Sequence, residues 1–209
     1  MSDEKPILDE FYVDAVAEVL NIGMGSAAAS LSEMINDEVK LSVPGVKFVT
    51  RLVATEHIAE KAKSDVSGVH QYFQGAFGGD AMLLFPEEQS LQLVRAVLQQ
   101  DDMTLEDLTE MEQEAMTEIG NVILNSCLCS MADMFGKEMR GEIPEFVQGS
   151  VEQVLTDDTR KSQNTEAIVL LLNMDFSVDS KNIQGYVTFL MDVDEVMQLK
   201  QNIQVFLGE

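Results

Sequence analysis

The chain has 209 residues, of which 45% are apolar, and this is enough to bury the core of a folded globular protein. Its formal net charge of -24 disfavours nucleic acids and anionic membrane surfaces as partners, because both repel an acidic protein. No stretch approaches the roughly 18 uninterrupted apolar residues of a membrane-spanning helix, and no signal sequence is recognisable, so we expect a soluble cytoplasmic protein.

The first half of the chain is predicted to begin with a long helix. Its apolar residues fall within about 60° of one another at helical spacing and predict a buried stripe of Val16, Leu20, Ala27, Leu31 and Met34. Asn36 is of a type that accepts the left-handed cap at a helix end. Pro44 is expected at the mouth of the first strand. Strands are then predicted at 47–53, 69–77 and 81–85, with the polar residues 54–67 as a connection and a glycine-rich turn before the last strand.

The second half repeats this order, with a long helix followed by strands and a shorter helix. The predicted buried stripe of its long helix is Met116, Gly120, Ile123, Cys127, Met131 and Met134. Cys127 and Cys129 point about 200° apart on this helix, so they cannot form a disulfide and are expected to be reduced. Gly136 is the expected helix end and Pro144 the expected strand start. Strands are predicted at 166–176 and 185–191, joined by a hairpin turn at 179–182.

The two halves align with each other, which indicates an internal duplication. Residues 14–47 and 114–147 superpose without a gap at an offset of 100, and 8 of 34 positions are identical. The correspondence resumes at Gly79 and Gly185 with an offset of 106. We therefore predict one α+β domain over residues 1–209 with pseudo-two-fold symmetry, made of two repeats at about 9–100 and 108–209. The repeats are expected to share one continuous β-sheet with both long helices on its surface.

A carboxylate and a carboxamide recur at matching positions, as Glu18 and Asn21 in one helix and as Glu118 and Asn121 in the other. A spacing of three places each pair on one helical face. An Asn amide is no general base, but it can orient a water molecule for in-line attack on a phosphoryl group. A single such pair is typical of a solvated surface, whereas two matching pairs leave function and shared ancestry equally open.

The spacing of these residues resembles the signature of the CheC/CheX/FliY family of response-regulator phosphatases. That signature is Asp or Ser, three residues, Glu, two residues, Asn, 22 residues and Pro. The chain carries related patterns at Asp14, Glu18, Asn21 and Pro44 and at Glu114, Glu118, Asn121 and Pro144. Two motifs make the chain most similar to CheC, since the CheX branch carries one motif and the FliY branch is expected to have an additional C-terminal domain.

The resemblance implies an enzyme that hydrolyses the aspartyl phosphate of a CheY-like receiver domain in chemotaxis signalling. It implies that Glu18 and Glu118 contact a receiver lysine, while Asn21 and Asn121 orient the attacking water. The Mg²⁺ ion would belong to the receiver, so the chain is expected to have no cofactor and no metal site of its own. The remaining motif residues would have supporting roles.

The second motif differs from the first in two respects. The second motif opens on Glu114, outside the family pattern, and Asn125 and Leu128 make its helix face bulkier than Gly25 and Ala28 make the first. The two sites therefore need not be equal. The alternative to an enzyme is a non-catalytic binding module of the chemotaxis or flagellar switch system, whose partner would be CheD or a receiver.

Overall fold

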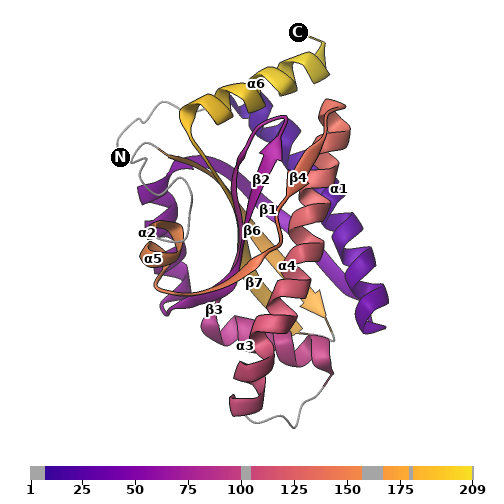
Figure 1. Ribbon diagram of the computed structural model, residues 1–209, viewed down its shortest axis with the longest axis vertical. Helices are drawn as coiled ribbons and strands as arrows, with labels where there is room; N and C mark the ends of the chain where they lie inside the picture. The colour runs from indigo at the N-terminus through magenta and orange to yellow at the C-terminus, as the bar shows by residue number, and fades with distance from the viewer. Residues whose placement is uncertain (1–7, 100–104, 157–166, 179–180, 209) are drawn as a thin grey trace.

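The computed structural model describes residues 8–99, 105–156, 167–178 and 181–208. The described residues form six helices and seven strands (Figure 1). In chain order these are α1 (Glu10–Ile35), β1 (Val39–Thr50), α2 (Arg51–Ala62), β2 (Val66–Gly75), β3 (Gly79–Pro86), α3 (Glu87–Leu98), α4 (Leu105–Phe135), β4 (Met139–Gly141), β5 (Glu145–Gly149), α5 (Val151–Thr156), β6 (Ile168–Val178), β7 (Lys181–Met191) and α6 (Val193–Leu207).

All the described strands belong to one antiparallel sheet. Its order is β1-β6-β7-β3-β2-β4, and β5 also pairs with β2. Each edge is supplied by the opposite half, because β1 pairs with β6 while β4 and β5 pair with β2. The strand order is symmetric. If β1 is exchanged with β4/β5, β2 with β6 and β3 with β7, the same order results when it is read from the opposite edge. One continuous sheet in a fold of helices and strands is as predicted. The symmetry of the strand order supports the duplication, which stays a prediction.

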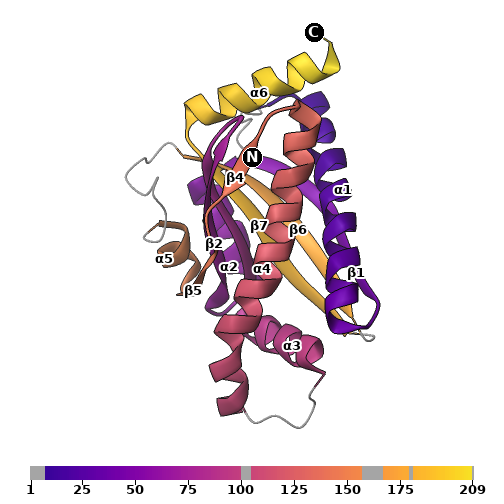
Figure 2. The ribbon, with the colours of Figure 1, turned by 45° about the vertical axis from the view of Figure 1, so that its right-hand side comes forward.

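Helices cover both faces of the sheet. Alternating residues of the strands point to opposite faces and pack into two apolar clusters. The larger cluster lies beneath α1 and α4, and the smaller one lies beneath α2 and α5 on the other face. The two views show α1 and α4 side by side on their face, with α6 near one end of the sheet and α3 near the other (Figures 1 and 2). The long helices therefore sit on the sheet surface, as predicted.

The long helices end where the sequence predicts. Asn36 has φ 54° and its N–H donates to the carbonyl of Ser32, and Gly136 has φ 58°. The predicted stripes are buried apart from Met34, which is 42% exposed, and Met134, which is half-buried. None of the helices in the described part of the chain has both the length and the hydrophobicity needed to cross a lipid bilayer.

The predicted polar connection at 54–67 is wrong, because α2 occupies Arg51–Ala62 and β1 already ends at Thr50. The Thr50 hydroxyl accepts a hydrogen bond from the Val53 N–H and caps the helix. Only Ala54 and Ile58 are buried along α2, so two apolar contacts four residues apart hold an otherwise polar helix. This pattern was too weak to predict a helix. The short helix α5 was also not predicted.

The two motif prolines lie in different surroundings. Pro44 is exposed inside β1, where the pairing with β6 shifts register between Ser42 and Gly45, so its predicted place at the strand mouth is wrong. An edge strand with a register shift tolerates a residue that has no N–H to donate. Pro144 is buried immediately before β5, as predicted. Of the predicted hairpin turn at 179–182, the first two residues lie outside the described part of the chain.

Two glycines allow close packing, one between the two long helices and one between α4 and the sheet. A Cβ at Gly23 would lie 2.9 Å from the carbonyl oxygen of Ser126, so α1 meets the backbone of α4 there. A Cβ at Gly120 would lie 2.0 Å from a methyl carbon of Val69, so α4 lies directly on β2. By contrast, nothing lies within 4 Å of a Cβ at Gly25. The position of the α4 face therefore depends on the absence of a side chain at Gly120.

The substitutions Gly120→Ala and Gly25→Ala are expected to change stability in opposite directions. Gly120→Ala should lower the free energy of unfolding by about 1–3 kcal/mol, because the methyl group overpacks the contact between α4 and β2. Gly25→Ala should raise it by about 0.5–1 kcal/mol through helix propensity, because the site is open. Urea unfolding measures both variants. An equal gain in both would contradict the close contact of α4 with Val69.

The two cysteines are expected to differ in reactivity. Cys127 is buried and Cys129 is exposed, and both are free. Burial raises the pKa of the Cys127 thiol to about 12, because the thiolate would lose its hydration. At mildly alkaline pH a thiol reagent should therefore modify Cys129 in the native protein and reach Cys127 only after unfolding. Mass spectrometry of the modified peptides checks this order, and similar rates at the two thiols would show that α4 is less tightly packed.

Candidate functional site

The first predicted pair lies on the exposed side of α1. Asp14, Glu18 and Asn21 are all exposed, and their spacing of four and three residues aligns them along one face. The neighbouring Ile22 is 59% exposed. Within the described residues, no hydrogen bond holds the Asn21 amide. The site is therefore open, and its side chains are free to adapt to a partner.

The second pair lies on α4 and is less open. Glu114 and Glu118 are exposed, whereas Asn121 is half-buried. Its Oδ1 accepts a hydrogen bond of 2.7 Å from Nδ2 of Asn125, one helical turn further along. Oδ1 of Asn125 accepts in turn from Nε2 of Gln71 in β2, at 3.1 Å. The second carboxamide is thus held by neighbours, and the first is not.

A groove adjoins the second pair. It has a volume of about 490 Å³ and lies where the end of α1, the end of α3 and the first part of α4 meet. Its lining residues are Met34, Ile35, Val97, Leu98, Met111, Glu114, Ala115 and Glu118. Met34 and Met111 are 42% and 37% exposed. The groove thus combines an apolar floor with two carboxylates, one of which belongs to the predicted pair.

The motif residues are brought together in two separate groups. Each Glu lies on the same helix face as its Asn, and no hydrogen bond or ion pair in the described part of the chain connects one pair with the other. Pro44 lies in the edge strand β1, while Pro144 follows the loop that packs against Gln71 through the carbonyl of Glu142. The structure therefore contains two candidate sites with different surroundings.

Sequence reasoning missed three contributors to the second site. Gln71 was read only as part of a strand, and Asn125 only as a bulkier neighbour. Met34 was assigned to the buried stripe, but it lies at the edge of α1, where the groove opens. The sequence offered one indication of these contacts, which is a glutamine on the inward face of a strand. A buried carboxamide needs hydrogen-bond partners, and Gln71 is buried.

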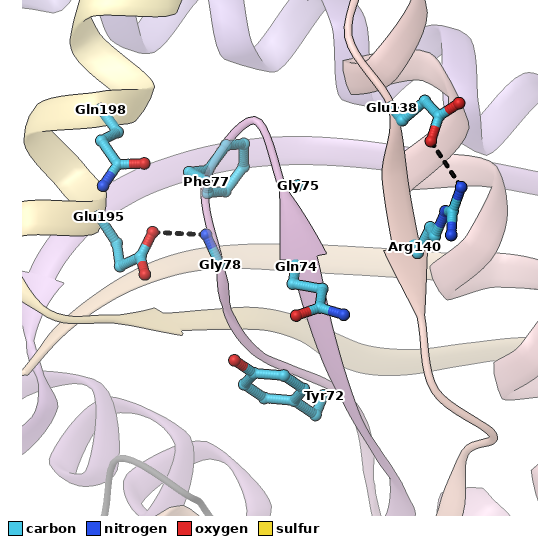
Figure 3. Close-up of a pocket in the computed structure, with 9 residues that line it drawn as sticks. All are labelled: Tyr72, Gln74, Gly75, Phe77, Gly78, Glu138, Arg140, Glu195 and Gln198. Carbon is cyan, nitrogen blue, oxygen red and sulfur yellow. Dashed lines mark hydrogen bonds and ion pairs between the residues drawn. The ribbon is translucent and has the colours of Figure 1, made fainter.

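A second cavity lies away from both pairs. It measures about 430 Å³ and is formed by the turn between β2 and β3, by β4 and by the start of α6 (Figure 3). Its charged side chains interact with other residues of the cavity wall. Arg140 pairs with Glu138 at 2.7 Å, and Glu195 accepts a hydrogen bond from the Gly78 N–H. Glu195 thus attaches α6 to the turn between β2 and β3.

No group of three or more His, Cys, Asp or Glu side chains in the described residues is arranged to hold a metal ion. Nε2 of His70 donates to the buried carboxylate of Asp80 at 2.8 Å, and Nε2 of His57 lies 3.3 Å from Oδ1 of Asn173. Both histidines therefore have partners within the fold.

Comparison with known proteins relates the first motif and the chain around it to one family. The model of the CheC-like family matches residues 13–48, which include the whole first motif. The CheY-P phosphatase CheC of Bacillus subtilis is 24% identical over 196 residues, covering 92% of this chain and 93% of that protein.

Solved structures share the fold. Thermotoga maritima FliY matches with a TM-score of 0.74 and 17% identity, over 95% of this chain and 98% of that one. The FliM middle domain from H. pylori matches with a TM-score of 0.61 and 8% identity, over 93% and 99%. These structures show the shared fold, and the family model together with the relative CheC confirms the resemblance to the CheC/CheX/FliY family.

Proposed function

We propose that this chain is a phosphatase that hydrolyses the aspartyl phosphate of a CheY-like receiver domain in the cytoplasm. The observation that carries the proposal is the presence of a Glu and an Asn side by side on the outer face of two neighbouring helices. A relative that spans nearly the whole chain bears the name CheY-P phosphatase. Asp14, Glu18 and Asn21 on α1 and Glu114 and Glu118 on α4 are exposed, so a protein-sized substrate can reach both pairs.

In the proposed reaction, water attacks the phosphorus atom in line with the bond to the aspartate oxygen. That bond breaks, inorganic phosphate leaves and the receiver carboxylate is restored. Asn21 or Asn121 orients the water through its amide, because catalysis of phosphoryl transfer depends on positioning and on charge. The receiver supplies Mg²⁺, which neutralises the phosphoryl oxygens.

The glutamates are proposed to fix the receiver on the helix. Glu18 and Glu118 are exposed, so each carboxylate can pair with a receiver lysine beside the phosphoryl group. Such a pair becomes stronger when the interface excludes water. Asp14 and Glu114, one turn earlier on the same faces, add negative charge that attracts the same lysine. The Glu residues therefore determine orientation, and the Asn residues act on the water.

The groove beside Glu118 is proposed to receive an apolar side chain of the receiver. Its methionines are flexible and adapt to differently shaped partners. Glu114 and Glu118 on its wall favour a segment in which an apolar residue lies close to a lysine.

A second candidate function is binding without turnover. The FliM middle domain shares the fold, and the fold alone does not distinguish an enzyme from a binding module. In this alternative the same helix faces would dock a receiver or CheD. A partnership with CheD stays a proposal that rests on the family resemblance.

Replacing the asparagines is expected to remove catalysis while leaving binding intact. Asn21→Ala and Asn121→Ala should each remove the contribution of one site, and the double variant should lose about 100-fold or more of the acceleration. Loss of phosphate from a labelled receiver measures the rates. Affinity for a beryllofluoride-activated receiver should remain within about twofold, since the Glu residues are unchanged. Full acceleration in the double variant would show that the residue assignment is wrong.

Substitutions in the groove are expected to weaken docking. In an Asn21→Ala background, Met111→Gln should raise KM about fivefold to thirtyfold with kcat unchanged, because a polar amide replaces apolar contact area. Met197→Gln is the matched control, since Met197 is exposed on α6 at the other end of the sheet (Figure 1). Equal KM values for the two variants would exclude the groove from the docking surface.

A further inference from the structure

A chain of three carboxamides connects the sheet with the second site. Nε2 of Gln71 donates to Oδ1 of Asn125 at 3.1 Å, and Nδ2 of Asn125 donates to Oδ1 of Asn121 at 2.7 Å. The same Nε2 also donates to the carbonyl of Glu142 at 2.6 Å. The amide group of Gln71 therefore connects β2 with α4 and with the loop after β4.

Gln71 is well placed to orient the others because it cannot move freely. It is 1% exposed and lies on the face of β2 that packs against α4. A Cβ at Gly141 would lie 2.2 Å from Nε2 of Gln71, so the end of β4 closes tightly over the amide. Oε1 of Gln71 is buried without a hydrogen-bond partner among the described residues, so the two bonds of Nε2 set the orientation of the amide. Turning the amide over would also leave Oδ1 of Asn125 and the carbonyl of Glu142 without this donor.

This orientation is passed on to Asn121. Its Oδ1 has two lone pairs, and Asn125 occupies one of them. The other lone pair is left to accept a hydrogen bond from water. Since the bond from Asn125 fixes the amide plane of Asn121, the direction of that lone pair is set before any partner arrives.

The first site has no such chain. Gly25 occupies the position that corresponds to Asn125, and it has no side chain to reach Asn21. The space around Gly25 is open, and Asn21 is exposed. Asn21 must therefore lose its rotational freedom when the receiver binds, whereas Asn121 has lost it on folding.

We propose that Gln71 and Asn125 are positioning residues that preorganise Asn121 for its water. The second site is then ordered before the receiver binds, whereas the first site becomes ordered only when the receiver binds. This inference rests on the proposed function. Preorganised groups lower the barrier because no reorganisation is needed during the reaction.

The test uses the full chain in an Asn21→Ala background, so that the second site alone is observed. Asn125→Asp keeps an oxygen that accepts from Gln71 but replaces the donor to Asn121. It should lower kcat by about tenfold and leave KM within about twofold. Gln71→Met, which adds no charge, should also lower kcat. Asn182→Asp is the matched control for added charge, because Asn182 is exposed on β7.

Two further measurements separate positioning from a merely structural role. In an Asn121→Ala background, Asn125→Asp should have no further effect on kcat, since it acts through Asn121. In NMR relaxation, the side-chain amide of Asn121 should be rigid in the wild type and mobile in Asn125→Ala, whose methyl group offers it no hydrogen bond, while that of Asn21 is mobile in both. The second measurement needs no catalysis.

Several results would overturn the inference. An unchanged kcat in Asn125→Asp, or no remaining activity in the Asn21→Ala background, would show that the amide chain has no catalytic role even though the protein is a phosphatase. A complete lack of activity in the wild type would instead overturn the proposed function. In that case a mobile Asn121 amide would overturn the positioning as well.

Discussion

The structure depends on the packing of two long helices on one face of a sheet that both halves of the chain build. At Gly23 the backbones of α1 and α4 approach closely, and at Gly120 α4 lies directly on Val69. Each helix therefore buries most of one stripe and keeps a fixed rotation about its axis. That rotation places the Glu and Asn side chains outside, where a partner protein can reach them. Supplying each edge of the sheet from the other half also prevents the two helices from separating.

Much of this arrangement follows from patterns in the sequence. The buried stripes, the left-handed caps at Asn36 and Gly136 and the apolar runs of β3, β6 and β7 are local signals, and each predicted its element. The exchange of edge strands was not predictable, because nothing in β1 indicates that it pairs with β6 rather than with a strand of its own half. Helix α2 was missed because only Ala54 and Ile58 contact the core.

The site was predictable in its residues but not in its surroundings. A spacing of three placed each Glu beside its Asn, and the structure retains this arrangement. The differences between the two sites come from residues that are distant in sequence. Gln71 reaches Asn125 from another element, and the groove beside Glu118 needs the ends of α1 and α3. Such contacts depend on the three-dimensional packing. The sequence did indicate that the sites differ, through Gly25 and Asn125, and the structure explains how.

The proposed function requires that the helix faces act on a phosphorylated receiver and release it again. The most direct measurement is the loss of phosphate from a labelled receiver in large excess over the wild-type chain. We expect each molecule of the chain to dephosphorylate many receivers, with a rate proportional to the amount of chain added. If the receiver lost its phosphate only at its own rate, or if the effect stopped at one receiver for each chain, the chain would be a binding module and the proposed function would be wrong.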